Sequence, residues 1–258
     1  MAKYKPIIDK MTWSYTRIKC FEECPYQFFL RYIYKANNEE MFYSSFGKFM
    51  HGLLERFYNG QIKKEDLKKE FLLNFSSEVK GERPSEQTVC KYIKDGLSYL
   101  DSFEPIPLEK ISVESKQFFK LNNYYFVGVI DYLGLDGNDL CIVDHKSKRL
   151  KPRSKKKRLT KNDKDIEKTL DQLYLYAVPI EREYKRLPKY LCINSFLANN
   201  FIKEPFRLER YEEIKRWAID TIHKIEETDE FNPEIEYFRC KYLCGLNNSC
   251  EYYQMFNN

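Results

Sequence analysis

Hydrophobic residues recur at helical spacing through the first hundred residues of this chain and at strand spacing after them. The clearest helical pattern covers residues 44–59 and ends at Gly60. Its apolar positions are Phe46, Met50, Leu53, Leu54 and Phe57. Further helices are predicted at 12–34, with an interruption at Pro25, at 63–76 and at 85–103. The pattern therefore predicts a helical N-terminal region that spans residues 1–104.

Two prolines, Pro105 and Pro107, mark the change from helical to extended segments. Segments rich in β-branched and aromatic residues then predict strands at 109–120, 124–135, 139–146, 189–197 and 202–207. Two amphipathic segments predict helices at 164–185 and 210–227. This order of elements predicts an α/β core over residues 105–228, preceded by the helical region.

The composition is that of a water-soluble globular protein, with 43% hydrophobic and 32% charged residues. No apolar run approaches the roughly 20 residues needed to cross a membrane, and the first residues lack the apolar stretch of a signal peptide. We therefore expect an intracellular, cytoplasmic protein with no membrane partner. In that reducing compartment, the eight cysteines are expected to bind metal or to pack in the core, without forming disulfides.

Three polar residues lie on two consecutive predicted strands that a Gly-containing turn joins. Asp131 lies on the first strand, and Asp144 and Lys146 lie on the second. Residues i and i+2 of a strand point to the same face, so Asp144 and Lys146 can converge on one point. Carboxylate oxygens suit Mg²⁺ or Mn²⁺, and an adjacent ammonium can orient or polarise an attacking water. Metal-assisted phosphodiester hydrolysis needs these groups, although Asp-x-Lys alone is also common in solvated hairpins.

The order of these residues resembles a known active site. Asp131 on a strand, a turn, and then Val143-Asp144-His145-Lys146 resemble the hairpin of the PD-(D/E)xK nuclease superfamily, in particular of its RecB-like exonuclease branch. Asp144 stands where Glu is commoner. The resemblance implies a restriction-endonuclease-like core, with a mixed central sheet flanked by helices. It also implies that Asp131, Asp144 and Lys146 are catalytic and that both aspartates bind the metal.

The same resemblance implies a function. By this resemblance, the chain would be a metal-dependent DNA exonuclease with Mg²⁺ or Mn²⁺ as cofactor, and it would hydrolyse phosphodiester bonds at single-stranded DNA ends. Such an enzyme would act in DNA repair, recombination or phage DNA processing, with a helicase, a recombinase or an integration complex as partner. Two alternatives stay open: a CRISPR-associated accessory nuclease that trims DNA for integration, and a non-enzymatic DNA-binding module that keeps the nuclease fold.

Further residues match elements of the RecB-like branch. His51 lies in the segment Gly47-x3-His51, and the resemblance implies that it helps to bind the metal; a lone histidine in an amphipathic helix otherwise packs or faces solvent. Gln172 and Tyr176 lie four residues apart, on one face of a predicted helix. They resemble the family's Gln-x3-Tyr element and are expected to bind DNA or to order the site. Glu114 is expected to support the site and not to bind the metal.

Cysteines near both ends of the chain suggest a second metal site. Thiolates at short spacing can bind zinc or an iron–sulfur cluster. The resemblance implies a 4Fe-4S cluster that joins the ends, so that residues 229–258 pack on the N-terminal region. Its ligands would be Cys24, Cys240, Cys244 and Cys250. The spacing Cys240-x3-Cys244 is one residue longer than usual, which leaves zinc or an incomplete site open, with Cys20 as a competing ligand. The remaining cysteines, Cys90, Cys141 and Cys192, are expected in the core.

A basic insert follows Lys146 and covers residues 147–162. From Lys146 to Lys161, both included, there are ten lysines or arginines and no acid, so the segment is expected to be mobile. Because it leaves the strand that carries Lys146, it should bind substrate phosphates beside the active site; the alternative is a solvated loop without function. The residues expected to contact DNA are Lys155, Lys156, Lys157 and Arg158.

Overall fold

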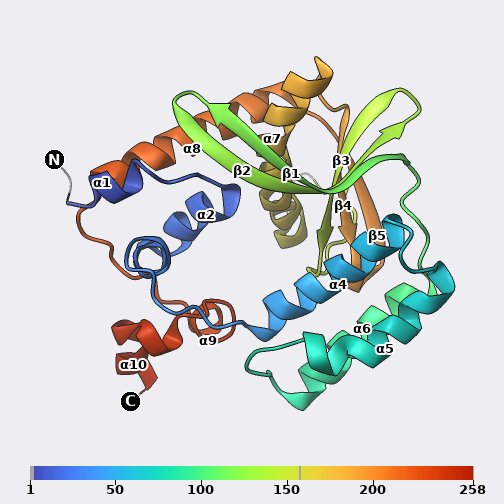
Figure 1. Cartoon of the computed structure of the whole chain (residues 1–258), viewed down its shortest axis with the longest axis horizontal. Helices are drawn as coiled ribbons and strands as arrows, with labels where there is room; N and C mark the ends of the chain where they lie inside the picture. The colour runs from blue at the N-terminus through green and yellow to red at the C-terminus, as the bar shows by residue number, and fades with distance from the viewer. Residues whose placement is uncertain (1–2, 157, 258) are drawn as a thin grey trace.

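A mixed five-stranded sheet forms the centre of the protein (Figure 1). The computed structural model describes residues 3–156 and 158–257. The strands are β1 (Glu109–Leu121), β2 (Tyr124–Asp136), β3 (Asp139–Lys146), β4 (Tyr190–Ser195) and β5 (Asn200–Pro205). They lie in the order β1-β2-β3-β4-β5, with β3 parallel to β4 and the other neighbours antiparallel. This arrangement confirms the predicted fold class, and the five predicted strands are all present.

The helices follow the predicted order. They are α1 (Lys5–Ile8), α2 (Tyr15–Glu23), α3 (Pro25–Phe28), α4 (Phe42–Tyr58), α5 (Leu67–Glu78), α6 (Glu86–Asp101), α7 (Lys161–Tyr184), α8 (Leu208–Glu227), α9 (Tyr237–Tyr242) and α10 (Glu251–Asn257), with a π-helical turn η1 (Phe29–Ile33) and 3₁₀ turns η2 (Lys64–Asp66), η3 (Phe196–Ala198) and η4 (Asn247–Ser249). Local chemistry sets several helix ends: Ser14 caps α2, Pro25 begins α3, and Gly60, at φ +71°, follows α4. The short helices α1, α9 and α10 were not predicted, because none is long enough to show a hydrophobic period. None of the described helices combines the length and apolar character that a membrane span requires.

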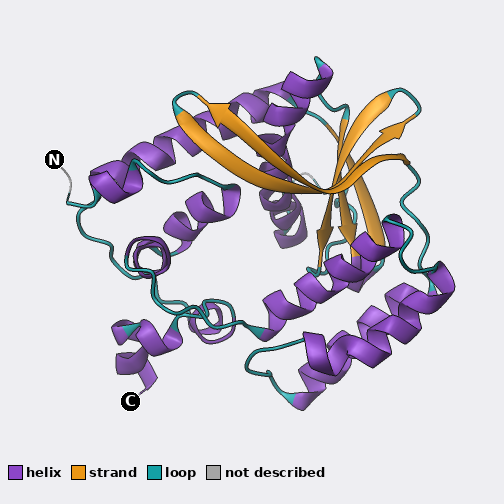
Figure 2. Cartoon of the chain, viewed as in Figure 1, coloured by secondary structure: helices purple, strands orange, loops and turns teal. Residues whose placement is uncertain are grey.

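Helices cover both faces of the sheet (Figure 2). One face packs against α2, α7 and α8 in the largest hydrophobic core, which includes Ile142 and Leu173. On the other face, Val143 belongs to a smaller cluster against which Tyr58, the last residue of α4, packs. Helices α4, α5 and α6 share a third cluster around Phe46. Helix α4 therefore links the sheet to the other helices of the N-terminal region, and its side chains can reach the strands.

Strands β1 and β2 form a ribbon that continues beyond the rest of the sheet (Figure 1). β2 pairs with β3 only over residues 132–136, whereas it pairs with β1 over nearly its whole length. On the other edge of this ribbon, the Trp13 N–H donates to the Tyr125 carbonyl at 2.7 Å and the Trp13 carbonyl accepts from the Val127 N–H at 2.8 Å. The segment before α2 therefore closes one edge of the ribbon, and β1 forms the other edge.

The C-terminal segment lies against the N-terminal helices. The Tyr26 hydroxyl donates to Glu251 at 3.0 Å, and the ring of Tyr26 lies 4.8 Å from that of Tyr252. Arg31 donates to the carbonyl of Cys244 at 2.5 Å. These contacts attach the segment from α9 to α10 to helix α3 and turn η1.

All eight cysteines are free thiols. Cys141 and Cys192 are buried in β3 and β4, as predicted. The prediction for Cys90 was wrong, because this residue is exposed. Helix α6 buries the face that carries Val89 and Leu100, and Cys90 lies about 100° around the helix from Val89. The helical period, and not the residue type, decides the burial of this cysteine.

Candidate active site

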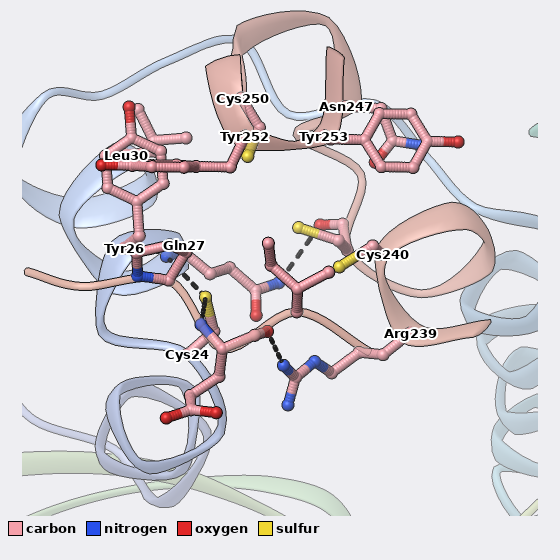
Figure 3. Close-up of a pocket in the computed structure, with 14 residues that line it drawn as sticks. Cys24, Tyr26, Gln27, Leu30, Arg239, Cys240, Asn247, Cys250, Tyr252 and Tyr253 are labelled. Atoms are coloured by element: carbon pink, nitrogen blue, oxygen red, sulfur yellow. Dashed lines mark hydrogen bonds between the residues drawn. The ribbon is translucent and has the colours of Figure 1, made fainter. Parts of the chain in front are cut away.

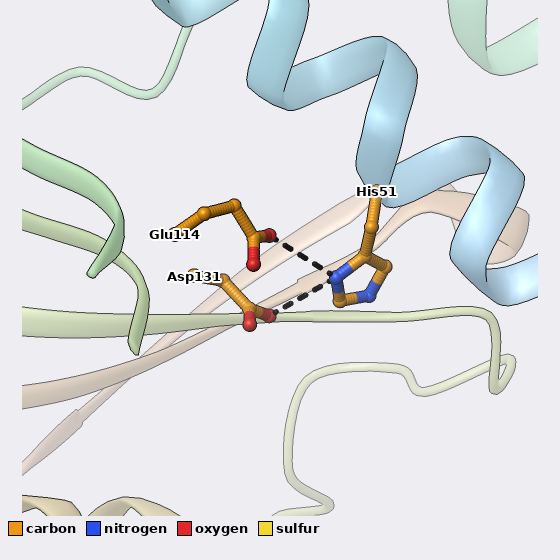
Figure 4. A group of neighbouring side chains, drawn as sticks. All are labelled: His51, Glu114 and Asp131. Atoms are coloured by element: carbon orange, nitrogen blue, oxygen red, sulfur yellow. Dashed lines mark ion pairs between the residues drawn. The ribbon is translucent and has the colours of Figure 1, made fainter. Parts of the chain in front are cut away.

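A histidine and two carboxylates converge between α4 and the β1–β2 ribbon (Figure 4). His51 Nδ1, from α4, lies 3.6 Å from Glu114 Oε1 on β1 and 3.6 Å from Asp131 Oδ2 on β2. One ligand atom from each of the three side chains lies within 4.8 Å of the other two. Among the described residues, no other group of three or more histidine, cysteine or acidic side chains is spaced this closely. Spacing of this kind suits a single metal ion.

Glu114 occupies an unusual backbone conformation. Its φ is +46°, a left-handed value that is uncommon for a residue with a Cβ. Such conformations cost about 1–3 kcal/mol and are often found at functional sites. Glu114 and Asp131 lie opposite each other, because the residues that flank them pair in register. The strained residue therefore supplies one of the two carboxylates that face His51.

The backbone of His145 fixes the orientation of Asp131 and His51. Its N–H donates to Asp131 Oδ2 at 2.7 Å, and its carbonyl accepts from His51 Nε2 at 2.8 Å. A carbonyl oxygen only accepts, so Nε2 carries a proton and the Nδ1 of a neutral His51 presents its lone pair to the carboxylates. In this tautomer His51 can bind a metal through Nδ1.

Asp144 and Lys146 form the second half of the site. Lys146 Nζ donates to Asp144 Oδ1 at 2.9 Å and to Gln172 Oε1 at 3.2 Å. The Gln172 amide in turn donates to the Tyr176 hydroxyl at 3.1 Å. The structure thus brings four of the predicted site residues into one series of contacts from β3 to α7. The closest group around His51, however, contains Glu114 and not Asp144.

Tyr176 packs directly on the backbone of β2. A Cβ added at Gly128 would lie 2.4 Å from Tyr176 Cε1, so only glycine allows the ring to approach this closely. The ring is buried, and its position determines where Gln172 can hold Lys146.

Burial and mutual charge shift the pKa values of the site. Burial, followed by the charge of Asp144, raises the pKa of Asp131 well above the usual range of a carboxyl. Burial lowers the pKa of His51, but the hydrogen bond with Glu114 and the charge of Asp131 outweigh it, so the net shift is upward. Burial also opposes the charge of Lys146, yet the neighbouring aspartates raise its pKa overall. Lys146 therefore favours its charged form, and the carboxylates around it can accept further positive charge.

The donor set fits a divalent cation. Carboxylate oxygens are the preferred ligands of Mg²⁺ and Mn²⁺, and imidazole is a common ligand of transition metals. Asp144 is only 2% exposed, and within the described part of the chain its Oδ2 receives no hydrogen bond, although Lys146 Nζ lies 2.8 Å away. A buried carboxylate oxygen that receives no hydrogen bond is stabilised by a cation bound close to it. His51, Glu114, Asp131 and Asp144 are the residues that could hold one.

The basic insert begins beside this site, and its first half is held by ion pairs. The pairs are Lys148 with Asp165, Arg149 with Asp95, and Arg153 with Glu167 and Glu204. Lys155, Lys156 and Arg158 are exposed and form no ion pair with the described part of the chain. Lys157 lies outside the described residues. The charges available to a polyanion are therefore in the second half of the insert.

Four cysteines from the two ends of the chain line one pocket (Figure 3). They are Cys24, Cys240, Cys244 and Cys250. Cys24 Sγ accepts hydrogen bonds from the Gln27 and Glu234 backbone N–H groups, each at 3.4 Å. Cys20 is buried in the main core and is not among the described residues that line this pocket. No three of these sulfur atoms lie within 4.8 Å of one another in the described residues, whereas four thiolates on one zinc ion would lie about 3.8 Å apart.

Comparison with known proteins identifies the family. The family model of the PD-(D/E)XK nuclease superfamily matches residues 12–251, and the chain therefore belongs to this superfamily of metal-dependent nucleases. A crystal structure of a candidate exonuclease from Eubacterium rectale is similar to the chain, with a TM-score of 0.53 and 8% sequence identity over 92% of this chain and 86% of that chain. At this identity the likeness shows a common fold.

Two features of the site were not foreseen from the sequence. Glu114 was expected only to support the site, yet its carboxylate lies as close to His51 Nδ1 as that of Asp131. The strand register, which sets Glu114 opposite Asp131, was the signal that could have indicated this. The contacts of His145 had no such signal, because its main-chain atoms make them.

Proposed function

We propose that this chain is a metal-dependent DNA exonuclease of the RecB-like type, which hydrolyses phosphodiester bonds at single-stranded DNA ends with Mg²⁺ or Mn²⁺. One observation carries the proposal: His51, Glu114 and Asp131 converge within 4.8 Å next to the buried Asp144–Lys146 pair. The superfamily match supports the class of reaction. The RecB-like type is supported by a histidine on a helix before the hairpin and by the Gln172–Tyr176 pair on the helix after it.

In this proposal each side chain has a distinct role. Asp131 and Asp144 bind the ion with His51, and Glu114 adds a further carboxylate. A bound divalent ion supplies Lewis-acid stabilisation of the transferring phosphoryl group and favours deprotonation of the attacking water. Lys146 keeps its proton and orients that water through a hydrogen bond. Gln172 holds Lys146 in place by accepting its hydrogen bond, and Tyr176 holds Gln172.

The surroundings of the site support a nucleic-acid substrate. Lys155, Lys156 and Arg158 are free to bind phosphates near the hairpin. The eight free thiols suit a reducing compartment, which supports a cytoplasmic location. Removal of nucleotides from DNA ends is a step that repair, recombination and phage DNA processing all require, and a helicase or recombinase would supply such ends.

We also propose that the four cysteines hold a 4Fe-4S cluster. The proposal rests on four thiols around one pocket, on sulfur spacings wider than a single zinc ion needs, and on N–H donors to Cys24 Sγ, which tune iron–sulfur centres. Burial raises the pKa of Cys244 to about 11, so the thiolate form here requires a cation. The cluster would join α3 to the C-terminal segment.

The proposed activity is tested with end-labelled single-stranded and duplex DNA, in Mg²⁺, in Mn²⁺ and in EDTA. We expect stepwise shortening of single strands with either metal and no cleavage in EDTA. Circular single-stranded DNA is the control that separates exonuclease from endonuclease activity, because it has no end. Binding of DNA without cleavage under any metal condition would instead assign the chain to the non-enzymatic DNA-binding class.

A further inference from the structure

The outer part of the β1–β2 ribbon has one open face that is continuous with the metal site. Alternate residues of a strand share a face, so the face of Glu114 continues outward along β1 and the face of Asp131 continues outward along β2. The strands stay in regular register from Val113 to Leu121. The residues that continue this face are Lys116, Phe118 and Lys120 on β1 and Val129, Val127 and Tyr125 on β2.

Burial agrees with this alternation. On the opposite face, Phe119, Leu121, Phe126 and Ile130 are buried in the main core and Gly128 is buried against Tyr176. The other residues of that face are half-buried: Ser115, Gln117 and Tyr124. On the open face, all but the half-buried Val127 are exposed. Helix α4 covers this face only near His51, so the ribbon beyond it is accessible to a ligand.

Two aromatic rings and two lysines dominate the open face. Phe118 is 70% exposed and Tyr125 is 64% exposed. Lys116 Nζ lies 5.0 Å from the centre of the Phe118 ring, and Lys120 Nζ lies 5.5 Å from that of Tyr125. Exposed rings next to cations are the features by which proteins stack bases and neutralise phosphates of single strands. The face carries no acid other than Glu114 and Asp131.

We propose that this face binds single-stranded nucleic acid and leads it to the metal site. The proposal rests on the proposed function and extends it by a substrate-binding surface that is separate from the basic insert. Bases stack on Phe118 and Tyr125, while Lys116 and Lys120 bind the backbone between them. From Asp131 to Tyr125 the strand covers about 20 Å at ~3.3 Å per residue, which is the length of about six nucleotides at the stacked spacing of ~3.4 Å.

Charge favours this ligand over a second copy of the chain. A copy that pairs with the free edge of β1 would bring Lys116 and Lys120 close to their own counterparts, and lysines on edge strands oppose such pairing. A polyanion that stacks on the rings instead meets only cations along the outer ribbon. The observations therefore support a nucleic-acid strand and not self-association.

The test compares a short and a long oligonucleotide in EDTA, where no cleavage interferes. Fluorescein-labelled dT3 reaches only the site, whereas dT12 also covers the ribbon, and fluorescence anisotropy gives the Kd of each. We expect wild-type protein to bind dT12 much more tightly than dT3. The double variant Phe118→Ala/Tyr125→Ala should bind dT12 at least about tenfold more weakly than wild type, and Lys116→Gln/Lys120→Gln should flatten the salt dependence. The matched control is Tyr34→Ala, because Tyr34 is 69% exposed but lies at the end of η1.

The outcomes separate this inference from the proposed function. If wild-type protein cleaves DNA but the ring variant keeps the wild-type ratio of the two Kd values, the binding face is wrong and the nuclease proposal stands. If wild-type protein cleaves no DNA with any metal, the proposed function itself fails. Sedimentation velocity gives the remaining contrary result: a dimeric wild type and a monomeric ring variant would assign this face to self-association.

Discussion

The acidic site on the sheet and the cysteine pocket at the chain ends are prepared for metal in different ways. In the first, the fold already holds the ligand atoms of His51, Glu114 and Asp131 within 4.8 Å, and the His145 backbone orients two of them. In the second, thiols from a loop, short helices and turns line one pocket, but no three sulfurs of the described residues lie that close.

The two sites therefore differ in how they contribute to the protein. The residues of the acidic site are carried mainly by paired strands, so we expect the fold not to depend on the ion. Loss of a ligand should therefore lower the rate of cleavage and leave the stability nearly unchanged. The cysteine pocket joins segments that have little core of their own, so binding free energy there is also folding free energy. Loss of a cysteine ligand should therefore cost stability first.

The largest expected effect is on cleavage by variants of the hairpin. Asp144→Asn and Lys146→Ala should each lower kcat by about 10³-fold or more, because the first weakens a metal ligand and the second removes the ammonium that orients the attacking water. Single-turnover cleavage of labelled DNA measures this, and circular dichroism should show a Tm within a few degrees of wild type. Lys148→Ala is the matched control, since the Lys148 ammonium pairs with Asp165 and not with Asp144 or Asp131. Near-normal turnover of Asp144→Asn would contradict the assignment.

Cysteine variants should show the opposite behaviour. Protein purified without oxygen should be brown, and Cys24→Ser or Cys244→Ser should lose colour and stability together. A loss of about 2 kcal/mol would lower the Tm by roughly 4–8 °C for a chain of this size. Cys90→Ser is the control, because Cys90 is exposed and is not among the residues that line the pocket. Colourless protein with one bound zinc would show that the four cysteines hold zinc and not a cluster. Full stability of both variants, with no metal bound to the wild type, would show that no metal joins the two segments.

The same contrast applies within the basic insert. Replacement of Lys155, Lys156 and Arg158 by Gln should reduce the slope of log Kd against log salt by about 2, at ~0.7 per phosphate contact with a single strand. Replacement of the paired Arg149 and Arg153 by Gln should instead lower the Tm, because Asp95 loses its ion pair with Arg149 and Glu204 loses its ion pair with Arg153. Equal salt slopes for wild type and the triple variant would show that the insert is only a solvated loop.

The smallest effect is expected from Tyr176. Tyr176→Phe keeps the ring on Gly128 but removes the hydroxyl that accepts from Gln172. Loss of one hydrogen bond of about 0.5–1.5 kcal/mol should lower kcat roughly 2- to 10-fold. A loss as large as that of Asp144→Asn would mean that the hydroxyl contacts the reacting phosphate and does more than position Lys146.

Periodicity and strand propensity were sufficient to predict the sheet and the long helices, because both depend on local patterns of burial. They also placed Asp131, Asp144 and Lys146 on the hairpin, and the i, i+4 spacing placed Gln172 beside Tyr176. They could not give the role of Glu114 or of the His145 backbone, since each depends on contacts between elements distant in sequence. Residue type alone likewise misplaced Cys90, and charge alone could not show which arginines of the insert are paired.

We expect the site of His51, Glu114, Asp131 and Asp144 to bind metal independently of the cysteine pocket. Titration of protein into Mn²⁺, followed by the electron paramagnetic resonance signal of the free ion, tests it without reference to activity. We expect wild type and Cys24→Ser to bind one Mn²⁺ with similar affinity and Asp131→Asn to bind it at least about 100-fold more weakly. Unchanged Mn²⁺ binding by Asp131→Asn, or its loss in Cys24→Ser that is still folded, would contradict the account.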